Sequence, residues 1–201
     1  AFKGDFVAQN ISVREEALFD YAFYDFPGFN EDTGLAFNPY TVKEVGGARV
    51  AIIGQAFPYT PIANPARFIP DWTFGIQDER MQEMVDQVRD EGSPDLDVVI
   101  SHNGMDVDIK MASRVTGIDA IMGGHTHDGM PAPIKVKNAS GVTLVTNAGS
   151  NSKFLGVLDF DVRGGKVQDF RYRLLPVFAN LLEADAEMAA YIEKVRAPYK
   201  D

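Results

Sequence analysis

The stretch IDAIMGGHTHDGMP, residues 118–131, decides the fold, because an apolar run in it stops at a double glycine that two histidines follow. The apolar run predicts a buried strand. Gly123 and Gly124 allow the backbone to turn tightly and to approach a ligand closely. His125 and His127 come next, one residue apart, in a chain that contains only 3 histidines. Their placement directly after a strand therefore points to a function.

The third histidine follows a second strand of the same design. LDVVISHNG, residues 96–104, is a buried strand that ends at His102. The following DVDIKMASRVTG predicts a short helix with Asp106 as its N-cap and Gly117 as its C-cap. The 23 residues from His102 to His125 are enough for a right-handed crossover through that helix. We therefore expect the two strands to be parallel neighbours.

The rest of the chain alternates strand and helix signals, which predicts an α/β fold without internal repeats. Met81, Met84 and Met188 have helical spacing and are predicted core residues. The other predicted elements are a strand at 6–13, a hairpin at 40–55 that turns at Gly46-Gly47, a helix at 77–91, a strand at 141–150, a hairpin at 154–175 that turns at Gly164-Gly165, and a helix at 183–199 that Pro198 breaks.

A proline-rich stretch interrupts this pattern. Residues 56–72, AFPYTPIANPARFIPDW, contain four prolines in 17 positions and predict a long ordered loop without regular structure. Ordered loops of this length are often functional. The loop is either a rigid cover packed on the sheet, which we favour, or a surface for a partner.

Composition excludes several classes of function. The 201 residues suffice for one sizeable domain, and a net charge of −10, from 29 acidic and 19 basic residues, opposes nucleic-acid binding. The absence of cysteine excludes thiolate metal sites, cysteine nucleophiles and disulfides. No apolar run reaches the roughly 18–20 residues that span a bilayer, and the opening AFKGDFVAQNIS has no targeting signal.

The histidines are expected to meet at one edge of the sheet. In an open α/β sheet, ligands bind outside the carboxyl ends of the parallel strands. His102 and His125 each follow such an end, and His127 can reach the same point from the next loop. A lone histidine is usually an ordinary surface residue, but three imidazoles at matched positions are typical of a metal site.

Polar residues near the histidines carry weaker signals. Asn103, in the SHNG stretch, is a candidate for orienting a ligand or contacting a substrate. Asp128 either orients an imidazole or is a turn residue, and Asn147 either reaches the same edge or belongs to an Asn-Ala-Gly turn. Asp108 is expected to face solvent.

With these residues in place, SHNG followed by GGHTHDG resembles the second half of the calcineurin-like metallophosphoesterase pattern, in its 5′-nucleotidase branch. A more particular match is VAIIGQAFPYTPIANPARFIPDW, which is similar to the SoxB family of sulfur-oxidation thiosulfohydrolases. FVAQNI, YTVKEVGG, SHNGMDVD and GHTHDGMP agree with the same family. Together these segments cover most of residues 5–160.

The resemblance implies part of a four-layer αββα sandwich with mixed sheets that carries two Mn²⁺ ions, with Zn²⁺ as the other candidate. Carried over to this chain, His102 and His125 would bind one ion and His127 the other, near Asn103, Asp128 and Asn147. The implied reaction is hydrolysis, in the periplasm, of a cysteine S-thiosulfonate on the SoxYZ carrier protein, which releases sulfate. Neither nucleic acid nor a membrane is an expected partner.

The family's upstream elements, D-x-H, G-D and G-N-H, are not found before FVAQNI in residues 1–201, and KGDF is not expected to replace them. The family's second domain, which closes over the substrate, is not found either. Residues 1–201 are therefore interpreted as the C-terminal portion of the catalytic domain, and the chain alone is expected to be inactive. The alternatives are a 5′-nucleotidase or other phosphomonoesterase of the same superfamily, and a non-catalytic metal-binding module.

Overall fold

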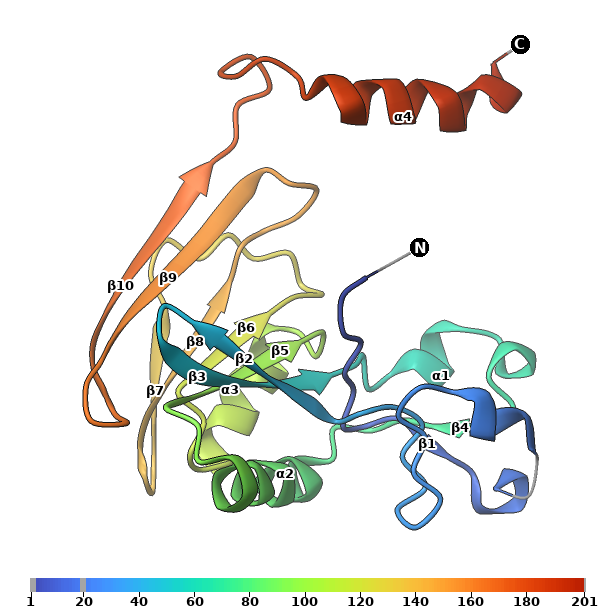
Figure 1. Cartoon of the computed structure of the whole chain (residues 1–201), viewed down its shortest axis with the longest axis vertical. Coiled ribbons are helices and arrows are strands. Elements are labelled where there is room, and N and C mark those ends of the chain that lie inside the picture. The colour runs from blue at the N-terminus through green and yellow to red at the C-terminus, as the bar shows by residue number, and fades with distance from the viewer. Residues whose placement is uncertain (1–2, 19–20, 201) are drawn as a thin grey trace.

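The computed structural model describes residues 3–18 and 21–200, and a mixed six-stranded sheet forms its centre (Figure 1). The four inner strands are parallel, and an antiparallel strand closes each edge. The strand order is β2 (Tyr40–Val45), β3 (Ala48–Gln55), β5 (Leu96–Ser101), β6 (Ala120–Gly123), β8 (Gly141–Asn147) and β7 (Ile134–Asn138). The predicted hairpin, and the predicted parallel pairing of β5 with β6, are confirmed.

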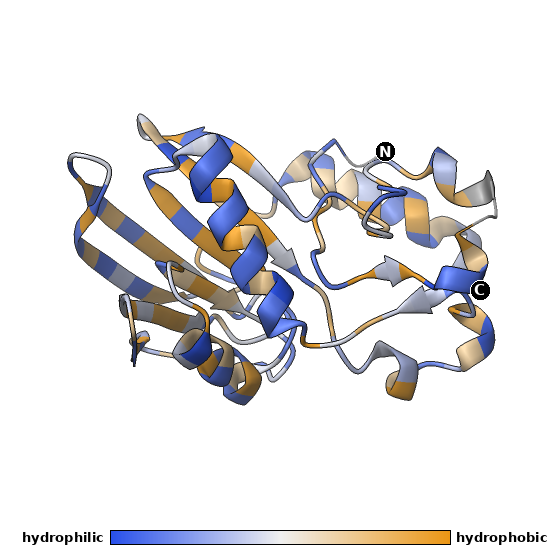
Figure 2. Cartoon of the chain, turned by 90° about the horizontal axis from the view of Figure 1, so that it is seen from below, coloured by the Kyte–Doolittle hydropathy of each residue, from blue (hydrophilic) through white to orange (hydrophobic). Residues whose placement is uncertain are grey.

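Two helices cover one face of the sheet. In α2 (Asp78–Gly92), Met81, Val85 and Val88 recur at helical spacing and are buried. Met111 of α3 (Met105–Arg114) packs into the same core, against alternate residues of the strands. Figure 2 shows the result, with hydrophobic residues concentrated in the sheet and hydrophilic residues on the outer sides of the helices.

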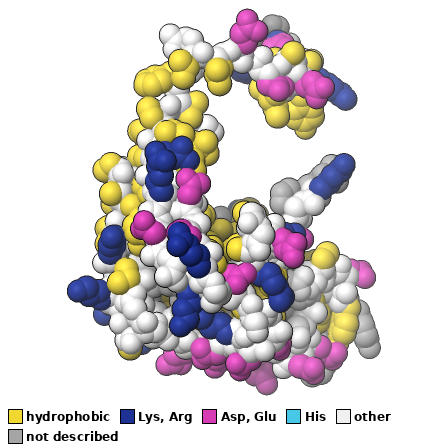
Figure 3. Space-filling view, turned by 60° about the vertical axis from the view of Figure 1, so that its left-hand side comes forward, with side chains coloured by type: hydrophobic (Ala, Val, Ile, Leu, Met, Phe, Trp, Pro, Cys, Tyr) yellow, Lys and Arg dark blue, Asp and Glu magenta, His cyan; other side chains and the backbone are white. Residues whose placement is uncertain are grey.

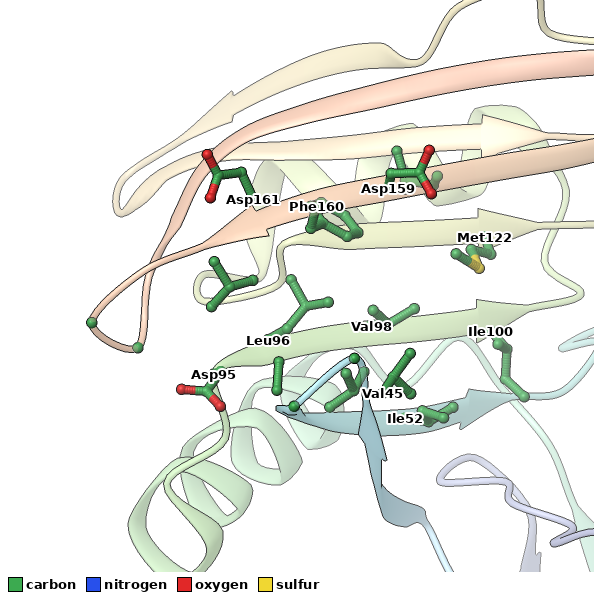
Figure 4. Close-up of a pocket in the computed structure, with 18 residues that line it drawn as sticks. Val45, Ile52, Asp95, Leu96, Val98, Ile100, Met122, Asp159, Phe160 and Asp161 are labelled. Carbon is green, nitrogen blue, oxygen red and sulfur yellow. The ribbon is translucent and has the colours of Figure 1, made fainter.

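The opposite face carries a long antiparallel hairpin, which confirms the prediction for residues 154–175. Its strands are β9 (Phe154–Val162) and β10 (Val167–Pro176), and Gly164 and Gly165 adopt φ of 59° and 71° in the turn. Phe160 packs against the sheet, and beside it lies an open apolar cleft of about 720 Å³ with Asp95, Asp159 and Asp161 among its lining residues (Figure 4). The chain therefore has helices on one face of the sheet and a hairpin on the other.

The last helix, α4 (Ala186–Arg196), lies away from the sheet (Figures 1 and 3). Asp185 caps it by accepting a hydrogen bond of 2.7 Å from the Met188 backbone N–H. The prediction that Met188 is a core residue is wrong, since 57% of it is exposed. Helical spacing indicates that Met188 belongs to an apolar stripe of α4. It does not indicate whether another element packs on that stripe. Among the described residues, no helix is long and apolar enough to cross a membrane.

Three predicted boundaries are wrong for local reasons. Of the strand expected at 6–13, only β1 (Ser12–Val13) forms, and it pairs with β4 (Trp72–Thr73). The preceding residues instead cross the end of β3, where the Gln9 N–H donates to the Gly54 carbonyl. Asp106 and Gly117 are not the caps of α3, because Gly104 precedes its first residue and Val115 follows its last.

The proline-rich segment does contain regular structure, contrary to the prediction. It forms α1 (Thr60–Ala63) and a 3₁₀ turn, because Pro61 lies at the start of α1, where proline is tolerated. Ile62 and Phe68 are 83% and 66% exposed, so this part of the segment is not a packed cover. The 3₁₀ turns within the described residues are η1 (Glu15–Ala17), η2 (Tyr21–Asp25), η3 (Ala66–Phe68) and η4 (Ala197–Tyr199).

The amino end of β5 holds an ion pair whose aspartate is buried and whose arginine is partly exposed. The side chain of Asp97 is fully buried, and its Oδ2 lies 2.5 Å from Nη2 of Arg89. Desolvation and the negative charge of Asp119, opposed by the Arg89 charge, together raise the pKa of Asp97 to about 6. Removing the arginine leaves a buried carboxylate without its counter-charge.

We expect Arg89→Gln to lower the free energy of unfolding by about 3 kcal/mol at pH 7.5. Without Arg89 the folded-state pKa of Asp97 rises further above its ordinary value of 3.8, so the loss is small near pH 4 and grows as the pH rises through 6. Urea unfolding at several pH values measures this. Arg114→Gln is the matched control, since its partner Asp78 is partly exposed, and it should cost at most about 1 kcal/mol. A loss for Arg89→Gln that does not change with pH would contradict the account.

Candidate metal centre

His102 and His125 meet at the carboxyl edge of the sheet. One directly follows β5 and the other lies two residues after β6, and their ring centroids are 5.2 Å apart at an interplanar angle of 67°. Both side chains are exposed. The structure thus brings two of the three predicted ligands together on an accessible edge, as the parallel arrangement of the strands requires.

The backbone that carries His125 and His127 is unusual. His125 and His127 have φ of 71° and 59°, in the left-handed region that few residues other than glycine adopt. The Thr126 N–H donates to the Gly124 carbonyl at 2.9 Å, which closes a γ-turn centred on His125. Backbone strain of this kind is concentrated at functional sites, where the surroundings hold it in place.

The electrostatics of the edge favour neutral imidazole. Desolvation lowers the pKa of His102, and the positive charges that His125 and His127 would carry lower it further. His127 therefore acts on His102 although the two are far apart in sequence. Metal ions bind deprotonated imidazole nitrogens, so this direction of shift suits a metal ligand.

His125 has an aromatic partner, Phe57, that was not predicted from the sequence. The ring of Phe57 lies 4.2 Å from that of His125, tilted by 31°, and 6.1 Å from that of His102. Phe57 comes two residues after β3, the parallel strand next to β5. Its place after the end of a third parallel strand was the signal in the sequence that could have predicted it.

Beneath the histidines runs a buried chain of hydrogen bonds. Gln9 donates to Gln55 at 2.6 Å, Gln55 donates to Asn103 at 2.9 Å, and Asn103 donates to Asp108 at 3.1 Å. Asn103 is only 2% exposed, and its hydrogen bonds support the edge from below. The prediction that Asp108 faces solvent is wrong, since it is fully buried.

Asn147 and Asp128 support the histidine loop. The Asn147 side-chain amide donates to the Gly124 carbonyl at 3.2 Å, and its oxygen accepts from the Gly149 N–H at 3.3 Å. Asp128 accepts a hydrogen bond of 2.6 Å from the Thr126 hydroxyl. These bonds hold the loop that carries His125 and His127. Asn147 both reaches the histidine edge and takes part in the Asn-Ala-Gly turn, so both interpretations that the sequence left open hold for this residue.

The donor set fits part of a metal site. Two imidazoles at one edge supply two nitrogen ligands, about half of a tetrahedral coordination sphere. Within residues 3–18 and 21–200, no group of three or more His, Asp or Glu side chains is close enough to hold an ion by itself. The remaining ligands of a bound ion would have to be water or other side chains.

The chain is similar to several known proteins in sequence and in structure. No protein-family model matches the chain. The trifunctional nucleotide phosphoesterase YfkN of Bacillus subtilis is 31% identical over 140 residues, which cover 68% of this chain and 9% of that protein. The sulfate thiohydrolase SoxB of Thermus thermophilus has a TM-score of 0.82 at 31% identity, over 98% of this chain and 33% of SoxB. These similarities support the 5′-nucleotidase family of metallophosphoesterases.

Another solved member of this family, a 5′-nucleotidase precursor of Thermus thermophilus, has a TM-score of 0.75 at 29% identity over 97% of the chain. The chain spans only 38% of that nucleotidase. The mixed α/β fold expected from the sequence is therefore confirmed, over a part of the length that these metallophosphoesterases have.

Gly124 directly precedes His125 and lies against the turn that carries His102. We therefore expect Gly124→Ala to disturb the positions of both histidines. A Cβ at this position would lie 3.1 Å from Nδ1 of His102 and 3.2 Å from the Ser101 carbonyl oxygen. The expected loss of unfolding free energy is about 1–3 kcal/mol. The imidazole ¹H–¹³C NMR signals of His102 should also shift in this variant. They can be assigned readily because the chain has 3 histidines.

Gly92→Ala is the matched control, since the nearest atom to its Cβ, on Pro94, is 4.0 Å away. It should leave the imidazole signals in place. Unchanged His102 signals in Gly124→Ala would contradict the packing described for this edge.

Proposed function

We propose that residues 1–201 form part of the catalytic domain of a metal-dependent hydrolase, with His102 and His125 as ligands of one divalent ion and His127 as a ligand of a second. The observation that carries the proposal is the contact of His102 with His125 at the exposed carboxyl edge of parallel strands. The strained backbone at His125 and His127 and the lowered pKa of His102 add support.

When bound, a pair of divalent ions would activate a water molecule and polarise the oxygens of the substrate. The chain's own residues prepare the edge for this role. Desolvation lowers the pKa of His102, Phe57 lies against the His125 ring, and the glycines before His125 let the backbone pass close to a ligand. A donor set of nitrogen atoms favours Zn²⁺ over Mn²⁺, so manganese would depend on additional oxygen ligands.

The finer proposal is a periplasmic thiosulfohydrolase whose substrate is a cysteine S-thiosulfonate on a SoxYZ-type carrier protein. Water would add to the sulfonate sulfur, the S–S bond to that sulfur would break, and the products would be sulfate and a cysteine persulfide. Support comes from the similarity to SoxB, whose TM-score of 0.82 exceeds the 0.75 of the Thermus nucleotidase. The proline-rich segment that resembles the SoxB family also contributes Phe57 to this edge.

A 5′-nucleotidase or another phosphomonoesterase is the second candidate. It is favoured by the similarity to the Bacillus nucleotide phosphoesterase, whose 31% identity equals that of SoxB. Phosphate and sulfonate groups both present tetrahedral oxygens to a metal pair, so the histidine edge suits either reaction.

Metal binding by the 201-residue chain tests the ligand assignment. We expect the chain to bind Zn²⁺ more tightly than Mn²⁺ in calorimetric titrations, because its histidine ligands are nitrogen donors. His125→Ala should abolish binding, and His127→Ala should weaken it. Lys137→Ala, at an exposed position of β7, is the control and should bind as the native chain does. Equal binding by the native chain and the His125→Ala variant would refute the assignment.

A substrate comparison tests the reaction and uses the whole protein that carries these residues. We expect sulfate release from glutathione S-thiosulfonate and little phosphate release from AMP. The His125→Ala variant should be slower by about 100-fold or more, since it loses a metal ligand. The opposite preference would establish the nucleotidase alternative, and hydrolysis of neither compound would argue for a non-catalytic metal-binding module.

A further inference from the structure

Asp108 is a buried carboxylate that the proposed chemistry does not use. It lies in the first turn of α3 and is fully buried. Desolvation raises its pKa to about 6, although hydrogen bonds from Ser101 and Asn103 oppose that shift. Burial of a carboxylate is costly, so its presence below the histidine edge calls for a role.

One oxygen of Asp108 holds the turn that presents His102. Its Oδ1 accepts hydrogen bonds from the Ser101 hydroxyl at 2.6 Å and from the Asn103 side-chain amide at 3.1 Å. The same hydroxyl accepts from the Asn103 backbone N–H at 3.0 Å. Ser101 and Asn103 are the two sequence neighbours of His102, so this oxygen fixes the backbone on both sides of it.

The other oxygen of Asp108 faces the second histidine-bearing strand. Its Oδ2 lies 2.7 Å from the point that a Cβ would occupy on Gly123, two residues before His125. The end of β6 can approach the carboxylate this closely only because residue 123 is glycine. A single side chain is therefore in contact with the ends of both β5 and β6.

We propose that Asp108 is a positioning residue that sets the placement of His102 relative to His125 for metal binding. The proposal rests on the proposed function, since it assigns Asp108 to the same metal centre. Asp108 would act through Ser101, Asn103 and Gly123 and would not touch the ion.

Asp97 provides a matched control within the same chain. It is also a fully buried carboxylate with its pKa raised to about 6, but it lies at the amino half of β5, paired with Arg89. Its replacement should affect stability without affecting the histidine edge. A purely structural role for Asp108 would make Asp108→Ala and Asp97→Ala behave alike.

The experiment compares Asp108→Ala, Asp108→Asn, Ser101→Ala and Asp97→Ala in the 201-residue chain, with Co²⁺ as the probe. Titration measures the affinity, and the visible spectrum of bound Co²⁺ reports the ligand geometry. The imidazole ¹H–¹³C signals of the metal-free chain report the placement of His102 and His125 independently of any metal. Urea unfolding of each variant measures stability.

We expect Asp108→Ala to weaken Co²⁺ binding about tenfold, to alter its spectrum and to move the imidazole signals of His102 and His125. In Asp108→Asn the amide oxygen can accept the two hydrogen bonds of Oδ1, so the affinity should stay within about threefold of the native value. Asp97→Ala should lower stability but leave the Co²⁺ affinity and the imidazole signals unchanged.

Unchanged affinity and imidazole signals in Asp108→Ala would overturn the proposal, as would equal changes in Asp97→Ala. If Asp108→Ala does not fold, Ser101→Ala decides, because it removes one of the two donors to Oδ1. If the native chain binds no Co²⁺, the metal centre of the proposed function fails. The imidazole signals then decide the positioning role on their own.

Discussion

Most buried polar groups in proteins have a hydrogen-bond partner, and at the carboxyl edge of the sheet such hydrogen bonds tie three distant parts of the chain together. Gln9, Gln55, Asn103 and Asp108 form one continuous chain of hydrogen bonds under the histidines. Because each member depends on the next, losing one would leave others unsatisfied in a low-dielectric interior. These buried hydrogen bonds therefore support the exposed edge that carries His102 and His125.

The two faces of the sheet differ in how completely they are covered. Helices α2 and α3 close one face with a continuous apolar core. On the other face the β9–β10 hairpin packs through Phe160 and leaves an open cleft beside it. The histidine edge lies between these faces, at the strand ends, so its geometry depends on the well-packed helix layer and on the crossover through α3.

Patterns that depend on local periodicity were predictable from the sequence. Continuous apolar runs, paired glycines and the length of the crossover were enough to place β5 beside β6 and to bring His102 to His125. Tertiary contacts were not predictable in this way. The sequence around Asp108 is typical of a solvent-exposed helix turn. Its burial depends on tertiary contacts such as the close approach of Gly123. By contrast, β7 was not predicted although its sequence carries a strand signal, since apolar Ile134 and Val136 alternate with Lys135 and Lys137.

The left-handed backbone at His125 and His127 restricts how this edge can change over evolution. Apart from glycine, the residues that adopt such a conformation most readily are asparagine, aspartate and histidine. All three bind metal ions, histidine through nitrogen and the other two through oxygen. A protein with this loop can therefore exchange a nitrogen donor for an oxygen donor by one substitution, with little change in backbone strain. Under the proposed function, the loop conformation would thus favour metal-binding side chains at these two positions while leaving the preferred ion free to change.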